Sequence, residues 1–117
     1  MTDRARRREL TEEYRQHPPE AGVYQLVNTV TGKVFLGSAV NLSSVRSKLE
    51  FSQRTGTVSA LDRKLRADLT EYGAAAFTFE VLEVLDILPN ATPASIRDDL
   101  ATLEALWREK VDPARLY

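Results

Sequence analysis

The sequence predicts an α+β domain in which helices flank a small β-sheet. Two short segments rich in β-branched and aromatic residues, 22–28 and 33–38, are separated by a connection of hairpin length. Amphipathic helical segments follow them, with one further strand-like segment at 77–85. A chain of 117 residues is the size of a single domain, so we expect these elements to share one core.

The first two strands are expected to form an antiparallel hairpin. The segment 22–28 reads Gly-Val-Tyr-Gln-Leu-Val-Asn, and the segment 33–38 reads Lys-Val-Phe-Leu-Gly-Ser. The residues between them, 29–32, contain a Thr-Gly step and have the length of a hairpin loop. The segment 77–85 alternates between apolar and polar residues closely enough to be a third strand.

Two helices are predicted between the second and third strands. The first spans about 42–53, with Asn41 placed to cap it and Thr55-Gly56 to end it. Its apolar residues share one face: Leu42, Val45 and Leu49. The second spans 59–72 and has the cleanest amphipathic pattern of the chain, followed by Gly73 at a position that favours a left-handed cap. Its apolar stripe consists of Leu61, Leu65, Leu69 and Tyr72.

A helix is also predicted near each end of the chain. The last one begins with Thr92-Pro93, a capping residue followed by Pro at the first helical position, and runs to about Val111. Its stripe consists of Ile96, Leu100, Leu103, Trp107 and Val111. The first one spans 3–16 and stops before His17-Pro18-Pro19. We therefore expect an N-terminal helical extension, 1–20, and a domain, 21–117. The extension docks either on its own domain, giving a monomer, or on a second copy, giving a homodimer.

The composition excludes several classes of function. The chain has no Cys and one His, which excludes disulfides, thiolate catalysis and zinc sites built from Cys or from several His. No segment approaches the roughly 20 apolar residues that a membrane span needs, and the N-terminus has no apolar signal core. We therefore expect a cytoplasmic protein that does not enter a membrane.

Charge is distributed unevenly along the chain. The net charge of −1 gives the chain as a whole none of the positive excess of a strong nucleic-acid binder. Residues 21–73 nevertheless hold seven basic and four acidic groups, whereas residues 74–117 hold four basic and eight acidic groups. The basic residues of the middle segment are candidates for phosphate contacts, and an ordinary solvated helix surface explains them equally well. They are Lys33, Arg46, Lys48, Arg54, Arg63, Lys64 and Arg66.

One carboxylate departs from the amphipathic pattern of the last helix. Glu104 lies beside Leu100 and Trp107, on the face expected to meet the core. A salt bridge to Arg108 one turn later explains it structurally, and spacing alone favours that interpretation over a functional site. Tyr24, taken alone, is likewise most simply a core aromatic residue whose hydroxyl group reaches a partner.

Several short motifs, taken together, change these interpretations. Residues 22–24 read Gly-Val-Tyr and residues 35–37 read Phe-Leu-Gly, followed by a Ser-Ala-x-Asn-Leu segment. An Asn-Thr-x-x-Gly-Lys loop spans 28–33, and a Glu-x-x-Trp pattern spans 104–107. On these motifs, in this order and spacing, the chain resembles the GIY-YIG nuclease family from about Ala21 to Asp112.

The resemblance implies a three-stranded antiparallel sheet flanked by helices, and cleavage of nucleic-acid phosphodiesters with one divalent cation. It implies that Tyr24 lies by the attacking water or acts as its base, and that Glu104 binds the metal. A hard oxygen ligand is what Mg²⁺ or Mn²⁺ requires, with water and substrate phosphate completing its shell. DNA is then the expected partner.

The sequence departs from the family pattern at three positions that the resemblance assigns to the site. Phe35 replaces the tyrosine of the second motif, Val45 stands where the family has an arginine, and Leu49 stands where a polar residue, commonly histidine, is found. Arg46 is adjacent to Val45, but one residue along a helix is a rotation of about 100°. Loss of one donor that stabilises a transition state costs about 10²- to 10³-fold in rate.

Three hypotheses follow. In the first, the domain binds nucleic acid, DNA in particular, and its hydrolytic activity is weak or lost. In the second, it is an active endonuclease that uses Tyr24, Glu104 and Mg²⁺ or Mn²⁺, with positive charge supplied by Arg46 or Lys33. In the third, which the near-neutral charge suggests, it is a protein-interaction or small-ligand module with no nucleic-acid role.

Overall fold

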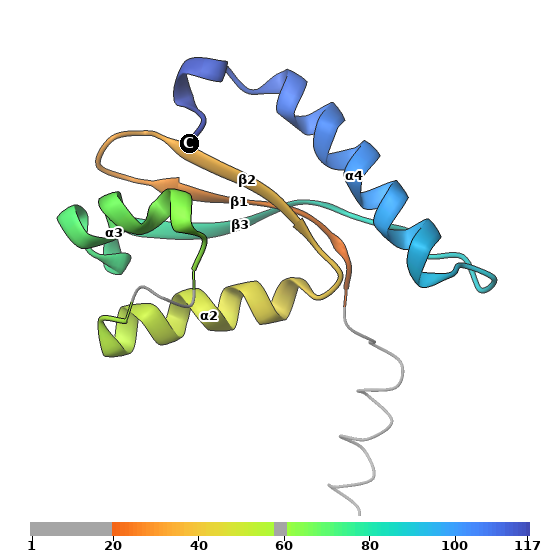
Figure 1. Cartoon of the computed structure of the whole chain (residues 1–117), viewed down its shortest axis with the longest axis horizontal. Helices are drawn as coiled ribbons and strands as arrows, with labels where there is room; N and C mark the ends of the chain where they lie inside the picture. Colours follow the sequence, from red (N-terminus) through yellow and green to blue (C-terminus); the bar gives the residue numbers. More distant parts are fainter. Residues whose placement is uncertain (1–19, 58–60) are drawn as a thin grey trace, which may run out of the picture.

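Three antiparallel strands form one sheet in the order β2-β1-β3. They are β1 (Gly22–Asn28), β2 (Val34–Ala39) and β3 (Phe77–Val84). Helices flank this sheet in the computed structural model (Figure 1), which confirms the α+β class and the three-stranded antiparallel sheet. The structure describes residues 20–57 and 61–117, so the predicted helix 3–16 and His17 lie outside the described residues.

The hairpin forms as predicted, with β1 as the central strand. Its loop is closed by hydrogen bonds between Asn28 and its neighbours: the Asn28 N–H donates to the Lys33 carbonyl, and the Gly32 N–H donates to the Asn28 carbonyl. On the other side of β1, the pairing with β3 shifts register between Val23 and Tyr24, which face Glu83 and Val81 respectively. Such an irregularity redirects the neighbouring side chains, and here it lies at Tyr24.

Helix α2 (Leu42–Thr55) begins as predicted and ends at the predicted Thr55-Gly56 step, two residues beyond the expected span of about 42–53. The Asn41 side chain accepts the backbone N–H of Ser44 and caps its first turn, and Gly56 ends it in the left-handed conformation with φ 76°. Helix α4 (Pro93–Lys110) also begins as predicted, because Thr92 and Ser95 form a reciprocal capping box around its N-terminus.

The helix predicted over 59–72 is wrong in its first part. The Asp62 side chain accepts the backbone N–H of Lys64 at 2.9 Å and starts a short 3₁₀ turn, η1 (Arg63–Leu65), which leads into α3 (Arg66–Tyr72). An Asp that captures an N–H in this way begins a helical segment instead of continuing one. Residues 59 and 60 lie outside the described part of the chain.

The apolar stripe of that segment is confirmed for its leucines and wrong for Tyr72. Leu61, Leu65 and Leu69 are all buried, although Leu61 precedes the helical turns, whereas Tyr72 is 37% exposed. Two further 3₁₀ turns complete the chain: η2 (Ala74–Ala76) before β3 and η3 (Pro113–Arg115) after α4. In the described residues, no helix has the length and apolar character needed to cross a membrane.

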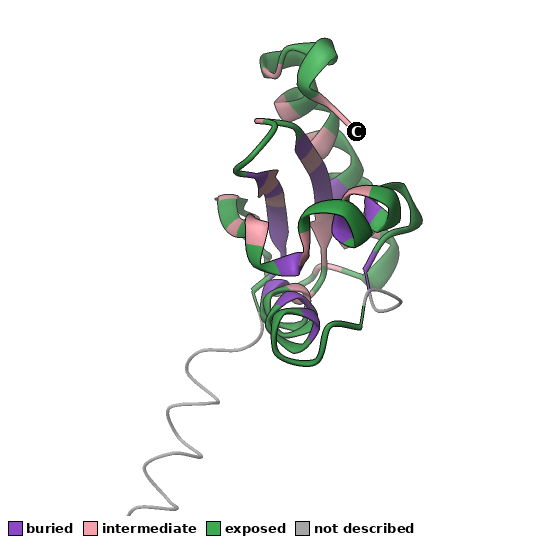
Figure 2. Ribbon diagram, turned by 90° about the vertical axis from the view of Figure 1, so that its left-hand side faces the viewer, coloured by how far each residue is buried: buried purple, intermediate pink, exposed green. Residues whose placement is uncertain are grey.

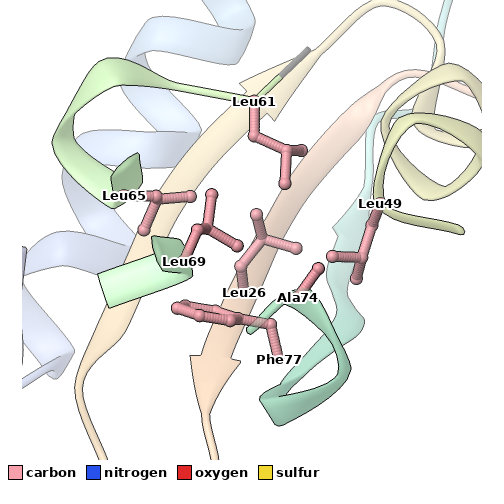
Figure 3. Packing of buried hydrophobic residues seen from close by; sticks show 7 residues of the cluster. All are labelled: Leu26, Leu49, Leu61, Leu65, Leu69, Ala74 and Phe77. Carbon is pink, nitrogen blue, oxygen red and sulfur yellow. The ribbon is translucent and has the colours of Figure 1, made fainter. Parts of the chain in front are cut away.

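The core lies between the sheet and the pair α2 and α3. Because side chains alternate along a strand, Tyr24, Leu26 and Asn28 share this face of β1. Figure 3 shows Leu26 packed among residues from α2, η1, α3, η2 and β3. The cluster consists of Leu26, Leu49, Leu61, Leu65, Leu69, Ala74 and Phe77. Figure 2 shows the buried residues gathered on the strands and on the inward faces of the helices.

Helix α4 covers the opposite face of the sheet and contacts β1 and β2. Its buried anchor is Leu100, and the indole N–H of Trp107 donates to the carboxylate of Glu83 at 2.9 Å. The two faces of the sheet therefore meet different helices.

Candidate active site

Tyr24 is half buried in the middle of an aromatic group that spans the three strands. Its ring stacks on Phe79 of β3, with centroids 5.7 Å apart and planes at 26°. On the other side it meets Phe35 of β2 at 6.4 Å and a tilt of 40°. These neighbours fix the plane of the phenol, because aromatic rings pack preferentially in offset or tilted geometries.

The phenol of Tyr24 lies over Gly37, its partner on β2. A Cβ atom added to Gly37 would stand 2.7 Å from the Tyr24 hydroxyl oxygen and 2.8 Å from Cζ, closer than real Cβ contacts. The glycine of the second motif is therefore required by the ring that covers it. The same geometry directs the hydroxyl group of Tyr24 toward β2 and away from Phe79.

The surroundings of the Tyr24 hydroxyl are apolar and negative. Burial raises its pKa above 10.0, and the carboxylates of Asp62 and Glu104 raise it further, in that order. No Lys or Arg is among the groups that shift this pKa. Within the described ranges the hydroxyl makes no hydrogen bond. The site therefore combines a neutral phenol with two carboxylates that come from other elements.

Glu104 forms the salt bridge that its spacing predicts. Its Oε2 accepts from Nη2 of Arg108 at 3.2 Å, with the two side chains 29% and 45% exposed. Such an exposed pair holds its partners loosely, since its net stabilisation is below about 1 kcal/mol. Glu104 thus forms the predicted local ion pair on α4, and its charge contributes to the raised pKa of Tyr24.

Arg46 contacts the aromatic group at Phe79. Its guanidinium carbon is 5.1 Å from the centroid of the Phe79 ring, in a cation–π contact. Phe79 is on β3, whereas the Tyr24 hydroxyl is directed toward β2, and Arg46 is not among the groups that shift the pKa of Tyr24. The family's arginine position, Val45, is half buried, and Leu49 belongs to the core.

Two solved structures match this chain over most of its length. A mutant of the catalytic domain of the intron endonuclease I-TevI matches with a TM-score of 0.60 and 21% sequence identity, covering 84% of this chain and 91% of that one. Another structure of the catalytic domain of the homing endonuclease I-TevI matches with a TM-score of 0.57 and 23% identity, covering 83% and 95%. Neither family models nor curated proteins give a match to the sequence. The chain has the GIY-YIG nuclease fold.

Lys33 lies at the far end of the hairpin from the centre of this GIY-YIG fold. Its ammonium group is 5.6 Å from the ring centroid of Tyr117, and its backbone pairs with Asn28. Gly37, which lies under Tyr24, is four residues further along, about 13 Å at 3.3 Å per residue. The structure therefore does not bring Lys33 to the Tyr24 hydroxyl.

The other predicted basic residues are exposed on the helices of the core face. Lys48 and Arg54 belong to α2, and Arg63, Lys64 and Arg66 belong to η1 and the start of α3. The pair formed by Arg108 and Glu104 is the one ion pair within the described ranges. These cations are therefore solvated and not engaged by a described carboxylate.

Two residues of the site were not predicted from the sequence. Asp62 was assigned to the interior of a helix, where an Asp draws no attention, whereas it precedes the helical turns and its charge contributes to the raised pKa of Tyr24. Phe79 was assigned only to a strand, and its role as the surface under Arg46 arises from the pairing of β1 with β3. Both depend on tertiary contacts that leave no local pattern.

The donor set at this site matches a hard divalent cation held by one carboxylate. In the described part of the chain no group of three or more His, Cys, Asp or Glu residues could hold a metal ion. Mg²⁺ is commonly bound through one or two carboxylates, with water and substrate phosphate completing its octahedron. The oxygens of Glu104 suit that chemistry, and one of them, Oε2, accepts from the Arg108 guanidinium.

Proposed function

We propose that this domain binds nucleic acid on the surface of α2, η1 and α3, and that its capacity to hydrolyse phosphodiesters is weak or lost. One observation carries the proposal: the basic side chains of these helices are exposed and form no ion pair with a described carboxylate. The cations lie exposed on these helices, whereas the charges that act on Tyr24 are both carboxylates. A GIY-YIG fold supports DNA as the partner, since the fold is shared with the catalytic domain of an intron endonuclease.

Weak hydrolysis follows from what phosphoryl transfer requires. Its transition state spreads negative charge over the phosphoryl oxygens, and an arginine aimed at them is worth several powers of ten in rate. Arg46 is held over the Phe79 ring in a cation–π contact. Phe35, Val45 and Leu49 offer no polar side-chain atom. The losses need not add, because groups that act together are not independent.

A divalent cation enters this proposal through Glu104. Mg²⁺ or Mn²⁺ bound there would supply positive charge next to the substrate phosphate. The chain's own contribution is the carboxylate that holds the ion and the half-buried Tyr24 phenol beside it. The high pKa of that phenol favours its neutral form, which can donate a hydrogen bond but is a poor base.

The competing proposal is an active endonuclease in which Arg46 supplies the missing charge. The position of Arg46 next to the aromatic group favours it over Lys33, which lies at the other end of the hairpin. It requires the guanidinium to leave the Phe79 ring and reach the substrate phosphate near Tyr24. That rearrangement distinguishes this candidate from the first, because Arg46→Ala would then abolish cleavage.

Binding is tested with a labelled DNA oligonucleotide at low and moderate salt. We expect measurable binding at low salt and a steep loss as salt rises, since each phosphate contact releases counterions. The pair of changes Arg63→Glu and Lys64→Glu should reduce the salt slope by about two, or about one per contact. The matched control is Arg97→Glu, a charge reversal of an exposed residue on α4. Absence of binding at low salt would leave the protein-interaction hypothesis in its place.

Hydrolysis is tested by incubating the protein with single-stranded, duplex and branched DNA in Mn²⁺. We expect little or no cleavage. Robust cleavage that disappears in Glu104→Ala would contradict the proposal of weak activity and establish an active nuclease. Cleavage that persists in Glu104→Ala would instead point to a contaminating enzyme.

A further inference from the structure

The outer surface of α2 carries an exposed aromatic ring between two cations. Phe51 is 43% exposed, although Leu42 and Leu49 on the same helix are buried. Lys48 precedes it by three residues and Arg54 follows it by three, and residues three apart are neighbours on a helix surface. The surface therefore presents a row of positive, aromatic and positive side chains, which we call the Phe51 row.

Phe51 is one of the exposed large apolar residues of the described chain. Its ring is not in the core cluster, and it forms no aromatic pair or cation–π contact with a described residue. The backbone carbonyl of Phe51 accepts a hydrogen bond from the Thr55 hydroxyl, and this bond does not involve the ring. Lys48 and Arg54 form no ion pair with a described carboxylate.

The chemistry of the Phe51 row matches an unpaired nucleotide. A base stacks on an exposed aromatic ring while adjacent cations contact the backbone phosphates, and this works for any base because every base has a π face. In a duplex, both faces of an interior base are already covered by its neighbours. We propose that Phe51 is a stacking platform and that the nucleic acid bound on this surface is single-stranded. This inference rests on the proposed nucleic-acid binding.

Charge complementarity favours this occupant over a second copy of the chain. A two-fold contact through the Phe51 row would place Lys48 and Arg54 against the same residues of the partner copy, with like charges opposed. Glu50 is the single acidic residue of α2; it is turned by about 100° from Phe51, lies one turn before Arg54, and forms no ion pair with it. A polyanion satisfies both cations at once.

The test compares Phe51→Leu and Phe51→Trp in binding to an unstructured single strand and to a hairpin duplex of the same length. Leucine keeps an apolar surface and removes the π face. We expect Phe51→Leu to weaken single-strand binding about tenfold and to leave duplex binding unchanged, while Phe51→Trp retains or improves it. The control is Leu106→Ala, which changes another exposed apolar side chain, on α4. Because Phe51 is exposed, the variants should unfold at the same temperature as the parent chain.

Each other outcome overturns a defined statement. Unchanged single-strand affinity in Phe51→Leu overturns the stacking platform, and if Arg63→Glu with Lys64→Glu still weakens binding, the proposed function stands without it. A concentration-dependent dimer in sedimentation velocity, abolished by Phe51→Glu, replaces the nucleic acid with a second copy. Absence of binding to either oligonucleotide by the parent chain at low salt overturns both the platform and the proposed function.

Discussion

Strand β1 has a tyrosine hydroxyl near each of its two ends: that of Tyr117 at Asn28 and that of Tyr24 at the other end. The two hydroxyl groups differ in whether a carboxylate is hydrogen-bonded to them. At the Asn28 end, the Tyr117 hydroxyl donates to Asp68 at 2.6 Å, and the Asn28 amide donates to the Tyr117 oxygen at 3.1 Å. At the Tyr24 end, the hydroxyl has no hydrogen-bond partner in the described residues. Asp62 and Glu104 act on it through their charge alone.

This difference separates a polar group that stabilises the fold from one that is available to a ligand. Asn28 is fully buried, and its side-chain oxygen also accepts the backbone N–H groups of Val30 and Thr31. A buried amide with all its bonds made fixes the hairpin loop. Tyr24 is half buried, and its hydroxyl group forms no hydrogen bond with a described residue. The two carboxylates that raise its pKa each have a local partner: Asp62 accepts the Lys64 N–H, and Glu104 accepts from Arg108. The site end of the strand is therefore held by packing, and its polar atoms can change partners.

The largest effect is expected from Asn28→Ala at the bonded end. The change removes four hydrogen bonds of a fully buried side chain and should lower the free energy of unfolding by about 3 kcal/mol in a urea titration. The control is Gln25→Ala on the same strand, which removes an exposed hydrogen bond to Glu80 and should cost less than about 1 kcal/mol. Equal losses in the two variants would contradict the stabilising role of the network.

The next effect concerns packing at the Tyr24 end. Gly37→Ala inserts a methyl group under the phenol and should cost about 1–3 kcal/mol, the range of overpacked cores. A double-mutant cycle with Tyr24→Ala locates the cause, since the penalty should vanish once the ring is gone. A penalty that stays in the double mutant would place the strain in the β2 backbone and not in the Tyr24 ring.

Most of this architecture could be predicted because its signals are local. The caps at Asn41 and Thr92, the hairpin loop and the leucine stripes are short patterns that the structure confirms. The prediction that a helix begins at 59 was wrong because the Asp62 side chain accepts the backbone N–H of Lys64. The spacing of apolar residues carries no information about such a hydrogen bond. The network of Asn28, Asp68 and Tyr117 was not predicted either, since its members come from a strand, a helix and the last residue of the chain.

The candidate site was likewise predictable where its signals are local and not where they depend on tertiary contacts. Tyr24 and Glu104 were found through short motifs, and the salt bridge to Arg108 through i,i+4 spacing. The contact that Arg46 makes was not predictable. Its rotation of about 100° from Val45 indicates that the two side chains point in different directions, but it does not identify the residue that Arg46 contacts. Its position over Phe79 depends on which strand borders β1, and that is a property of the whole sheet.

A smaller effect distinguishes the two hydroxyl groups directly. Tyr117→Phe removes a hydrogen bond to a carboxylate and should lower the free energy of unfolding by about 1.5 kcal/mol. Tyr24→Phe removes a hydroxyl that bonds to no described residue and should change it by less than about 0.5 kcal/mol. Paired urea titrations at pH 7 measure both. A larger cost for Tyr24→Phe would mean that its hydroxyl has a structural partner in the folded chain.

The finest distinction lies in how the two tyrosines titrate. Burial and the bond to Asp68 raise the pKa of Tyr117 from 10.0 to about 12, and burial followed by the charges of Asp62 and Glu104 raises that of Tyr24. Both groups hold their proton more tightly when folded, so each contributes stability below pH 10 that is lost as pH rises through the folded pKa. For Tyr117 that window runs from about pH 10 to 12.

Salt separates the effect of nearby charges from that of a hydrogen bond, because it screens exposed charges more than a short hydrogen bond. In difference titrations of tyrosinate absorbance against Tyr24→Phe and Tyr117→Phe, added salt should therefore lower the pKa of Tyr24 more than that of Tyr117. The opposite order would show that Tyr24 is hydrogen-bonded to a carboxylate, and the two ends of β1 would then be alike.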